Sequence, residues 1–369
     1  MVSLEATIQV RAGGRGRSYP VLVSPGLLSL LPKVIPAHAP AHRYAVITDS
    51  NVAPLYGRKV HEGLRGEGKD VELFEFPAGE ASKSREVWAT LTDAMLKSGF
   101  GRDSAVVAVG GGVTGDLAGF VAATFMRGVP IVQIPTTLVA MIDSSVGGKT
   151  GVDTVIGKNL VGAFHPPRLV AVDPDVSGTL PRDVRAQGLA EAVKHGAILD
   201  RAYLAELEKE LPLLLAGDPG ATARAVLRSI EIKSEVVSED ERESGLRQIL
   251  NFGHTLGHAM ESASDFGIPH GSAVALGMIL EARLGESMGV TESGSSEILE
   301  RVVRAMGLPT EIPEGLSLDE VLRFTQLDKK GRKGKPRYAL LTRLGYVDPD
   351  GGWGREVPTE EVERVLGGS

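Results

Sequence analysis

The sequence has 369 residues, of which 42% are hydrophobic and 24% are charged, and its formal net charge is −7. This length predicts two domains of roughly 100–200 residues each, and the composition excludes a chain that is disordered throughout. The acidic balance excludes general binding to nucleic acid, and the absence of cysteine excludes disulfides, thiolate zinc sites and cysteine nucleophiles.

The N-terminus, Met1-Val2-Ser3-Leu4-Glu5, has no basic start followed by an apolar run. We therefore expect no signal peptide. No apolar stretch approaches the ~20 residues of a membrane helix, so we expect no membrane partner. Together these features predict a cytoplasmic location.

The first half of the chain alternates apolar runs with helical patterns. Residues 4–30 predict short strands around the turn-rich segment 13–16, and residues 84–97 predict a helix. Buried strands are expected at 44–48, 71–76, 105–109 and 131–134. Strands that alternate with helices indicate a parallel, doubly wound sheet.

The pattern changes near residue 178, after which helical periodicity dominates up to residue 307. The clearest helical stretches are 184–199, 221–237, 246–263 and 272–288. We therefore expect a doubly wound, mostly parallel, Rossmann-like α/β domain at residues 1–177. An all-helical domain is expected to follow at residues 178–369.

A glycine-rich loop, Gly110–Asp116, follows the strand that ends at Val109 and satisfies the pattern G-x-G-x-x-G. Glycines at such a turn let backbone amides approach a pyrophosphate at the start of the next helix. A Rossmann loop follows the first strand, however, whereas here earlier strands precede it. On the loop alone, a tight turn of any α/β protein is an equal alternative; Asp49, upstream, is the best ribose-binding carboxylate.

The segment after the fourth strand also carries ligand-type groups. Thr136 and Thr137 lie at the strand's carboxyl end, and Gly147-Gly148-Lys149 follows them. Hydroxyls, close backbone and an ammonium favour an anionic ligand at this edge of the sheet. The alternative is an ordinary loop with a solvated lysine.

The sharpest local signal lies between Arg247 and Glu261. If the segment is one helix, its polar side chains fall on one stripe, and these are Arg247, Asn251, His254, His258 and Glu261. Such a stripe predicts a ligand-lined helix, which would make the helical domain the metal-binding one.

Two ligand sets fit this pattern. His254 and His258 at i,i+4 could share one metal, or His270 could be the second imidazole, kept neutral by the helix that follows it. Glu191, isolated among Leu, Ala and Val, is the candidate carboxylate. Spacing leaves both sets open, and two His with one Glu would be typical of a catalytic site.

Seven segments in order resemble the 3-dehydroquinate synthase family. They are Gly110–Asp116, Phe120–Gly128, Pro135–Lys149, Gly157–Asn159, Gly188–Lys194, Asn251–His258 and Asp328–Lys330. The resemblance runs from about residue 45 to 343.

The resemblance implies a phosphorus–oxygen lyase that converts 3-deoxy-D-arabino-heptulosonate 7-phosphate to 3-dehydroquinate and phosphate, on the route to chorismate. It implies NAD and Zn²⁺ or Co²⁺ as cofactors, and a small anionic sugar phosphate as substrate. The reaction would proceed by transient oxidation by NAD, phosphate elimination, re-reduction and intramolecular aldol closure.

The resemblance also assigns residues. It implies Glu191, His254 and His270 as metal ligands. It places NAD over Asp49, Asn51, Glu80, Lys83, Gly112, Val113, Thr114, Gly115, Asp116, Thr136, Thr137, Asp143, Lys149 and Lys158. It places the substrate against Arg127, Asp143, Lys149, Asn159, Lys194, Lys233, Arg247, Asn251, His258 and Lys329, with Lys330 as the alternative to Lys329.

Chemistry gives these residues expected roles. We expect the cations to form a focused positive pocket, with Arg247 on the substrate carboxylate and lysines on the phosphate. His258 is the candidate proton shuttle, and Asp143 is expected to orient a lysine or relay a proton. Arg127 is implied to reach the neighbouring subunit's site in a homodimer.

Three other functions fit parts of the pattern. A metal-dependent polyol dehydrogenase resembling glycerol dehydrogenase would share the glycine loop and helical domain, but it would not need the cations. Another sugar-phosphate cyclase would act on a substrate that lacks the carboxylate. A non-catalytic metal-binding protein would bind the ion without turnover.

Overall fold

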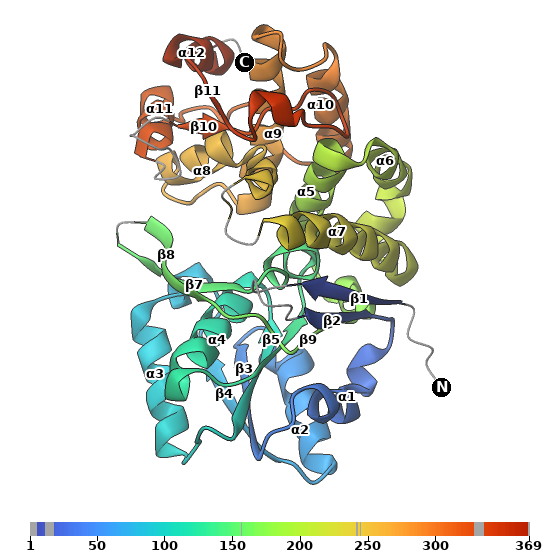
Figure 1. Cartoon of the computed structure of the whole chain (residues 1–369), viewed down its shortest axis with the longest axis vertical. Coiled ribbons are helices and arrows are strands. Elements are labelled where there is room, and N and C mark those ends of the chain that lie inside the picture. Colours follow the sequence, from blue (N-terminus) through green and yellow to red (C-terminus); the bar gives the residue numbers. More distant parts are fainter. Residues whose placement is uncertain are drawn as a thin grey trace. The chain divides into compact units, whose positions relative to one another are not determined.

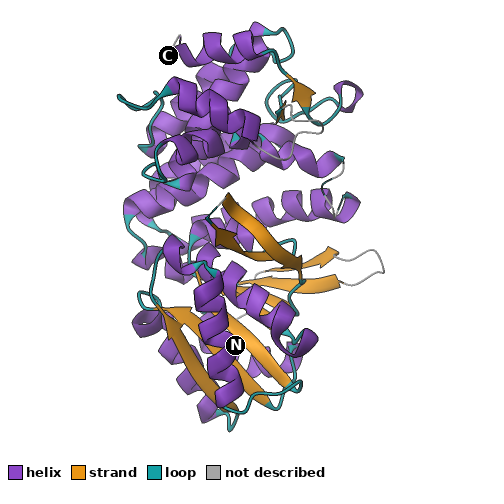
Figure 2. Cartoon of the chain, turned by 90° about the vertical axis from the view of Figure 1, so that its left-hand side faces the viewer, coloured by secondary structure: helices purple, strands orange, loops and turns teal. Residues whose placement is uncertain are grey.

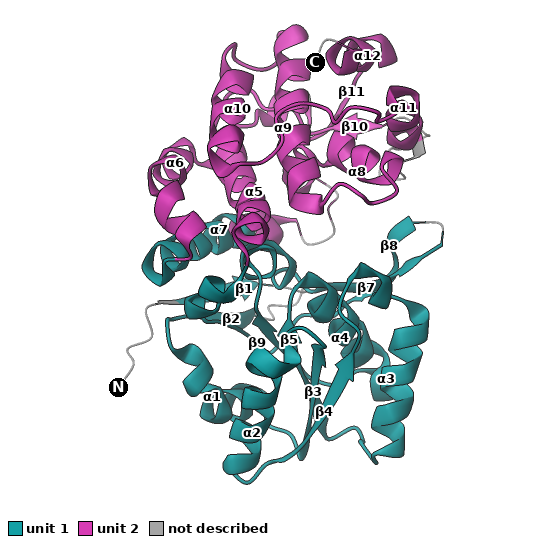
Figure 3. Cartoon of the chain, turned by 180° about the vertical axis from the view of Figure 1, so that it is seen from behind, with its two compact units in different colours: residues 1–180, 218–234 teal, residues 181–217, 235–369 magenta. Residues whose placement is uncertain are grey.

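The structure is a computed structural model that describes residues 6–11, 18–155, 157–240, 243, 245–327 and 336–367. Figure 3 colours its two compact units, residues 1–180 with 218–234 and residues 181–217 with 235–369. The domain bounds expected from the sequence, 1–177 and 178–369, stay a prediction. None of the described helices is both long and apolar enough to cross a membrane.

The first unit is built on a mixed sheet, with seven strands among the described residues, in the order β1-β2-β9-β6-β5-β3-β4 (Figure 1). These strands are β1 (Ala6–Arg11), β2 (Ser18–Val23), β3 (Arg43–Asp49), β4 (Asp70–Phe76), β5 (Ser104–Gly110), β6 (Ile131–Pro135) and β9 (Leu169–Val172). β1 and β2 pair antiparallel, and the remaining neighbours are parallel. The doubly wound, mostly parallel sheet expected from the apolar runs is therefore confirmed.

Helices cover both faces of this sheet. α1 (Leu31–His38) and α2 (Arg58–Gly66) lie on one side of it, and α3 (Arg85–Lys97) and α4 (Gly112–Thr124) on the other (Figures 1 and 3). Every residue of β5 is buried, as expected for a central parallel strand with helices above and below. Ile47, Val106 and Leu117 belong to the core between the sheet and α3 and α4.

An antiparallel ribbon of β7 (Lys149–Thr154) and β8 (Gly157–Phe164) lies outside the main sheet. The first unit also contains most of α7 (Pro219–Glu239).

The second unit is helical, as Figure 2 makes visible, with one short β ribbon among its described residues. Its elements are α5 (Arg182–Leu199), α6 (Arg201–Ala216), α8 (His254–Ala263), α9 (His270–Ser287), α10 (Ser295–Met306), α11 (Leu318–Leu327), β10 (Arg337–Tyr338), β11 (Arg355–Glu356) and α12 (Thr359–Gly367). Leu256, Met260, Leu276 and Leu280 join α8 and α9 in its core.

The single helix expected over 246–263 is wrong. Leu246–Asn251 forms a 3₁₀ helix, the chain turns at Phe252 and Gly253, and α8 begins at His254. Gly253 has a φ of +78°, a left-handed conformation that interrupts a helix. The polar side chains from Arg247 to Glu261 therefore do not form one stripe.

α8 and α9 approach each other through glycines. A Cβ on Gly277 would lie 2.0 Å from the carbonyl oxygen of Gly253, and a Cβ on Gly257 would lie 3.1 Å from that of Ala273. The two backbones are thus in direct contact, and no larger side chain fits between them at Gly277.

We expect Gly277→Ala to lower the free energy of unfolding by about 1–3 kcal/mol, because the added methyl forces α8 and α9 apart. Urea unfolding of the whole chain measures it. Gly367→Ala, at a helical position of the same unit with nothing within 4 Å, is the control and should be near neutral. Equal unfolding free energies for the two variants would contradict the proposed close approach.

Candidate functional site

The glycine loop lies where β5 leads into α4. Gly111 caps α4 without a side-chain hydrogen bond, and a Cβ on Gly110 would lie 2.3 Å from the Thr114 hydroxyl. β4 lies on one side of β3 and β5 on the other, so the carboxyl ends of β3 and β5 form a topological switch point. Ligands of open α/β sheets bind at such points.

Asp49 ends β3 beside this loop. Its Oδ1 accepts hydrogen bonds from the backbone N–H groups of Asn51 and Val52, and its Oδ2 accepts one from the Thr114 hydroxyl. The carboxylate predicted to bind a ribose is therefore oriented by its own turn and by the first turn of α4.

One observation favours a ligand at this edge of the sheet. The Thr136 hydroxyl, in a residue that is 2% exposed at the end of β6, finds no hydrogen-bond partner among the described residues. A buried polar atom without a partner costs free energy, so such atoms are typical of sites that a ligand completes. With the uncapped start of α4, this fits the diphosphate and ribose groups of a dinucleotide.

Lys83 contacts two residues for which the family resemblance implies different ligands. These residues are Asp116, implied to bind NAD, and Asn159, implied to bind the substrate. Its ammonium lies 2.6 Å from Asp116 Oδ2 in α4 and donates to Asn159 Oδ1 in β8 at 2.6 Å. Burial works against this charge, but Asp116 raises the pKa of the Lys83 ammonium above its ordinary value. The predicted cofactor residue Lys83 and the predicted substrate residue Asn159 are thus in direct contact.

Asp143 also pairs with a lysine. Lys233 Nζ from α7 lies 2.7 Å from Asp143 Oδ1 and also donates to the Asp143 carbonyl oxygen. Asp143 therefore orients this ammonium, one of the two roles expected for it.

The metal-ligand candidates converge within the second unit. Glu191 of α5, His254 of α8 and His270 of α9 each offer one ligand atom, and these atoms lie within 4.8 Å of one another. Glu191 Oε1 is 3.4 Å from His254 Nε2 and 3.3 Å from His270 Nε2. One carboxylate and two imidazole nitrogens are a donor set that zinc and cobalt accept, so these residues fit the ion.

The other ring nitrogen of each histidine is held by the protein. His254 Nδ1 lies 3.2 Å from the Phe252 carbonyl oxygen, and His270 Nδ1 lies 3.2 Å from Glu261 Oε2. An acceptor beside Nδ1 requires that Nδ1 carries the hydrogen and donates it. The Nε2 atom of each ring is then available for a metal.

Charge prepares two of the three groups for coordination. Burial opposes the charge of Glu191, but Lys194 and His254 hold the pKa of its carboxyl well below the ordinary range. Burial, followed by the charge of Lys194, lowers the pKa of His254. Lys194 and Glu191, both buried, form an ion pair.

His270 differs from expectation, because the sequence predicted a neutral imidazole at the start of a helix. Burial does disfavour its charge, but hydrogen bonds to Glu191 and Glu261 outweigh burial and raise the pKa of His270 to about 10. A metal that binds here must therefore displace a proton from His270.

The i,i+4 pair is the weaker ligand set. A second group, His258, Glu261 and His270, also lies within 4.8 Å, but among the described residues no such group contains both His254 and His258. His258 is 44% exposed, and its Nε2 is 3.9 Å from Glu261. This partly exposed imidazole next to the ligand set is in a suitable place to exchange protons with a bound molecule.

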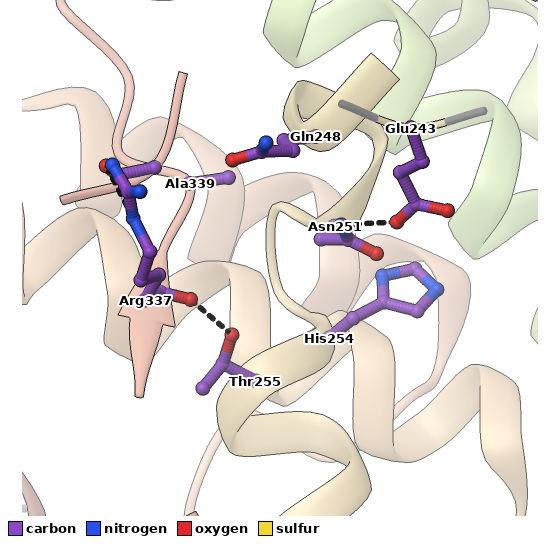
Figure 4. Close-up of a pocket in the computed structure, with 8 residues that line it drawn as sticks. Glu243, Gln248, Asn251, His254, Thr255, Arg337 and Ala339 are labelled. Atoms are coloured by element: carbon purple, nitrogen blue, oxygen red, sulfur yellow. Dashed lines mark hydrogen bonds between the residues drawn. The ribbon is translucent and has the colours of Figure 1, made fainter. Parts of the chain in front are cut away.

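A pocket opens beside His254 (Figure 4). Its lining includes Asn251, whose Nδ2 donates to Glu243 Oε1 at 2.8 Å, and Thr255, whose hydroxyl donates to the Arg337 carbonyl oxygen. Glu243 could not be predicted as part of the site, because nothing in its local sequence pattern distinguishes it from an exposed acid.

The remaining predicted residues are placed as follows. Arg247 is 2% exposed in the 3₁₀ helix before α8, and its backbone N–H donates to Asp240. Arg127 is exposed, with a φ of +67° directly after Met126 at +51°. Lys158 lies 3.7 Å from Glu80. Lys329 and Lys330 lie outside the described residues.

Four of the predicted cations are paired with carboxylates, whereas the focused positive pocket expected around the substrate stays a prediction. Lys83, Lys158, Lys194 and Lys233 are each paired with a carboxylate, on Asp116, Glu80, Glu191 and Asp143 respectively. These four ammonium groups are therefore held in fixed directions by their carboxylate partners.

The fold and these residues define an enzyme class with a glycine-loop α/β domain and a helical domain carrying a glutamate–dihistidine centre. Family models for the N-terminal and C-terminal parts of 3-dehydroquinate synthase match residues 73–187 and 188–331. The chain belongs to the 3-dehydroquinate synthase family, whose enzymes are phosphorus–oxygen lyases.

Curated relatives agree with this assignment. The chain is 47% identical over 331 residues to a 3-dehydroquinate synthase of Symbiobacterium thermophilum, covering 89% of this chain and 92% of that protein. It is 44% identical over 343 residues to that of Desulforamulus reducens, covering 93% and 95%.

Solved structures of related cyclases share the fold. A 2-deoxy-scyllo-inosose synthase complexed with carbaglucose-6-phosphate, NAD⁺ and Co²⁺ aligns with a TM-score of 0.89 and 28% identity, over 98% of this chain and 99% of that one. The 2-epi-5-epi-valiolone synthase of Streptomyces hygroscopicus with NAD⁺ and Zn²⁺ bound gives 0.86 and 29%, over 96% and 98%. A probable glycerol dehydrogenase of Sinorhizobium meliloti, at 0.66 and 18%, covers 94% and 95% and shares the fold alone.

We expect His270→Ala to lose bound zinc after dialysis, whereas His258→Ala keeps it, because His270, unlike His258, directs its Nε2 at Glu191. Metal content by atomic emission, with wild type in parallel, measures the difference. Equal loss from both variants would instead support the His254–His258 pair.

Proposed function

We propose that this chain catalyses the conversion of 3-deoxy-D-arabino-heptulosonate 7-phosphate to 3-dehydroquinate and phosphate. The observation that carries the proposal is the convergence of Glu191, His254 and His270 on one point, in a chain 44–47% identical to 3-dehydroquinate synthases. Family membership supports an enzyme, and the ligand geometry supports its metal dependence.

We propose that the first unit holds NAD and the second holds Zn²⁺ or Co²⁺. When bound, NAD supplies a reversible hydride acceptor, and the ion supplies a Lewis acid that lowers the pKa of a substrate hydroxyl. The uncapped start of α4 and the Thr136 hydroxyl support the nucleotide site. Cofactor-bound cyclases of the same fold support both assignments.

The chain's own side chains would bind, orient and deprotonate the substrate. Lys233, directed by Asp143, and Lys194, directed by Glu191, are placed to donate to anionic oxygens. His258 Nε2, exposed beside the ligand set, would accept a proton and return it. Arg247, a buried planar fork, would take the substrate carboxylate.

We also propose a cytoplasmic homodimer. The strained turn at Met126 and Arg127, of which Arg127 is exposed, supports the dimer, because left-handed conformations at two consecutive non-glycine residues persist where they serve a site. Arg127 would then reach the neighbouring subunit's substrate.

We expect purified protein to release phosphate from the heptulosonate phosphate without net accumulation of NADH. Release should require both NAD and metal, so removing either with a chelator or by omission should abolish it. A coupled phosphate assay and NADH absorbance measure the two products together. NADH that accumulates with a polyol, without phosphate release, would establish the dehydrogenase instead.

We expect Arg247→Ala to reduce kcat/KM for the heptulosonate phosphate by roughly 10²-fold or more, because losing one partner of a buried charge pair costs about 2–5 kcal/mol. Arg301→Ala, which removes only a surface pair with Glu208, is the control and should retain activity. Unchanged kcat/KM for Arg247→Ala would contradict the assignment of Arg247 to the substrate carboxylate.

A further inference from the structure

Glu281 is a buried carboxylate of α9 that binds the backbone at the start of α8. It is 0% exposed in the middle of α9, where its neighbours Ile279, Leu280 and Ala282 are apolar and buried. Its Oε2 accepts a hydrogen bond from the Gly253 N–H at 2.7 Å, and its Oε1 accepts one from the Leu256 N–H at 3.1 Å. A carboxylate of α9 thus binds the N-terminus of α8.

These two amides are the ones that a helix normally caps with its own side chains. Gly253 is the residue before α8, and Leu256 is the third residue of the helix. A capping box uses two local side chains, one for each of these N–H groups. Here Gly253 has no side chain to offer, and one carboxylate from another helix binds both groups.

The packing leaves no local substitute for this cap. A Cβ on Gly253 would lie 2.6 Å from Met278 Cγ and 2.9 Å from the Val274 carbonyl oxygen, so a capping serine or aspartate does not fit there. The negative charge of Glu281 also complements the partial positive charge at the start of α8. The start of this helix therefore depends on Glu281.

The residue that begins α8 is His254. Its Nδ1 lies 3.2 Å from the Phe252 carbonyl oxygen, and its Nε2 lies 3.4 Å from Glu191 Oε1. Glu281 binds the backbone on both sides of His254, at Gly253 and at Leu256. Any shift of this cap would move the imidazole relative to Glu191 and His270.

We propose that Glu281 is a positioning residue of the metal centre, which fixes His254 through the backbone of α8. The inference rests on the proposed metal ligands, and it adds a residue that binds neither metal nor substrate. An acid between apolar neighbours, Leu280 and Ala282, is the sequence signal that accompanies this role.

Glu281→Gln tests the proposal, because the amide is nearly the same size but presents an NH₂ donor to one of the two N–H groups. We expect the affinity for Zn²⁺, measured by competition with a chromophoric chelator, to fall 10- to 100-fold. The visible absorption bands of the Co²⁺-loaded protein should also shift, since they report the ligand geometry.

Glu286→Gln is the matched control. Glu286 lies on the same helix and caps α10, through the Ser296 N–H at 2.8 Å and the Ser296 hydroxyl at 2.7 Å. Because α10 carries no proposed ligand, this variant should keep wild-type Zn²⁺ affinity and Co²⁺ bands. An equal loss of affinity in both variants would overturn the proposal, since it would indicate general destabilisation.

Glu281→Asp keeps the charge and shortens the side chain, so it serves as the test variant if Glu281→Gln does not fold. It should show a smaller loss of Zn²⁺ affinity and a smaller Co²⁺ band shift. Wild-type affinity and bands in every folded Glu281 variant would overturn the inference alone. Failure of the wild type to bind either ion would instead overturn the proposed function.

Discussion

The second unit is organised around one buried charge, the carboxylate of Glu191. A carboxylate that is 1% exposed is costly unless cations and hydrogen-bond donors surround it, and here Lys194, His254 and His270 do so. These partners come from the next turn of α5 and from α8 and α9. The same charge that burial penalises therefore determines where three helices meet, and it is available to a metal in the deprotonated form that coordination requires.

Charge alone does not hold a ligand set, because long helices also need close and rigid contact. A Cβ on Gly271 would lie 2.2 Å from the Gln187 carbonyl oxygen of α5, which is nearly as close as the 2.0 Å from a Cβ on Gly277 to the Gly253 carbonyl oxygen. α9 therefore touches both other ligand-bearing helices at backbone distance. Backbones packed this closely leave no room for even one added methyl group. The contacts therefore limit how far the ligand atoms can move.

Much of this architecture could be predicted from the sequence. The strands of the sheet are continuous apolar runs, and the glycine loop, Glu191 and the histidines are recognisable by residue type. The break at Gly253 could not be predicted, since Asn251, His254 and His258 keep helical spacing across a turn that is not helical. The roles of Glu243, Glu261 and Glu281 could not be predicted either. Each carboxylate contacts a side chain or a backbone amide that lies in a distant segment or across a local turn. Sequence periodicity does not reveal such contacts.

The lysines proposed to bind the substrate are paired with carboxylates. This pairing changes how an acidic chain would attract an anion. A free lysine loses about 2 kcal/mol of rotamer entropy when a ligand fixes it, whereas Lys233 and Lys194 are already fixed by Asp143 and Glu191. The carboxylates reduce the long-range positive potential, so attraction at a distance is weaker. If Lys233 and Lys194 bind the substrate as proposed, each ammonium group is oriented before the substrate arrives, and binding an anion requires less reorganisation. This arrangement favours recognition of an anion by N–H donors in fixed directions rather than by an excess of positive charge.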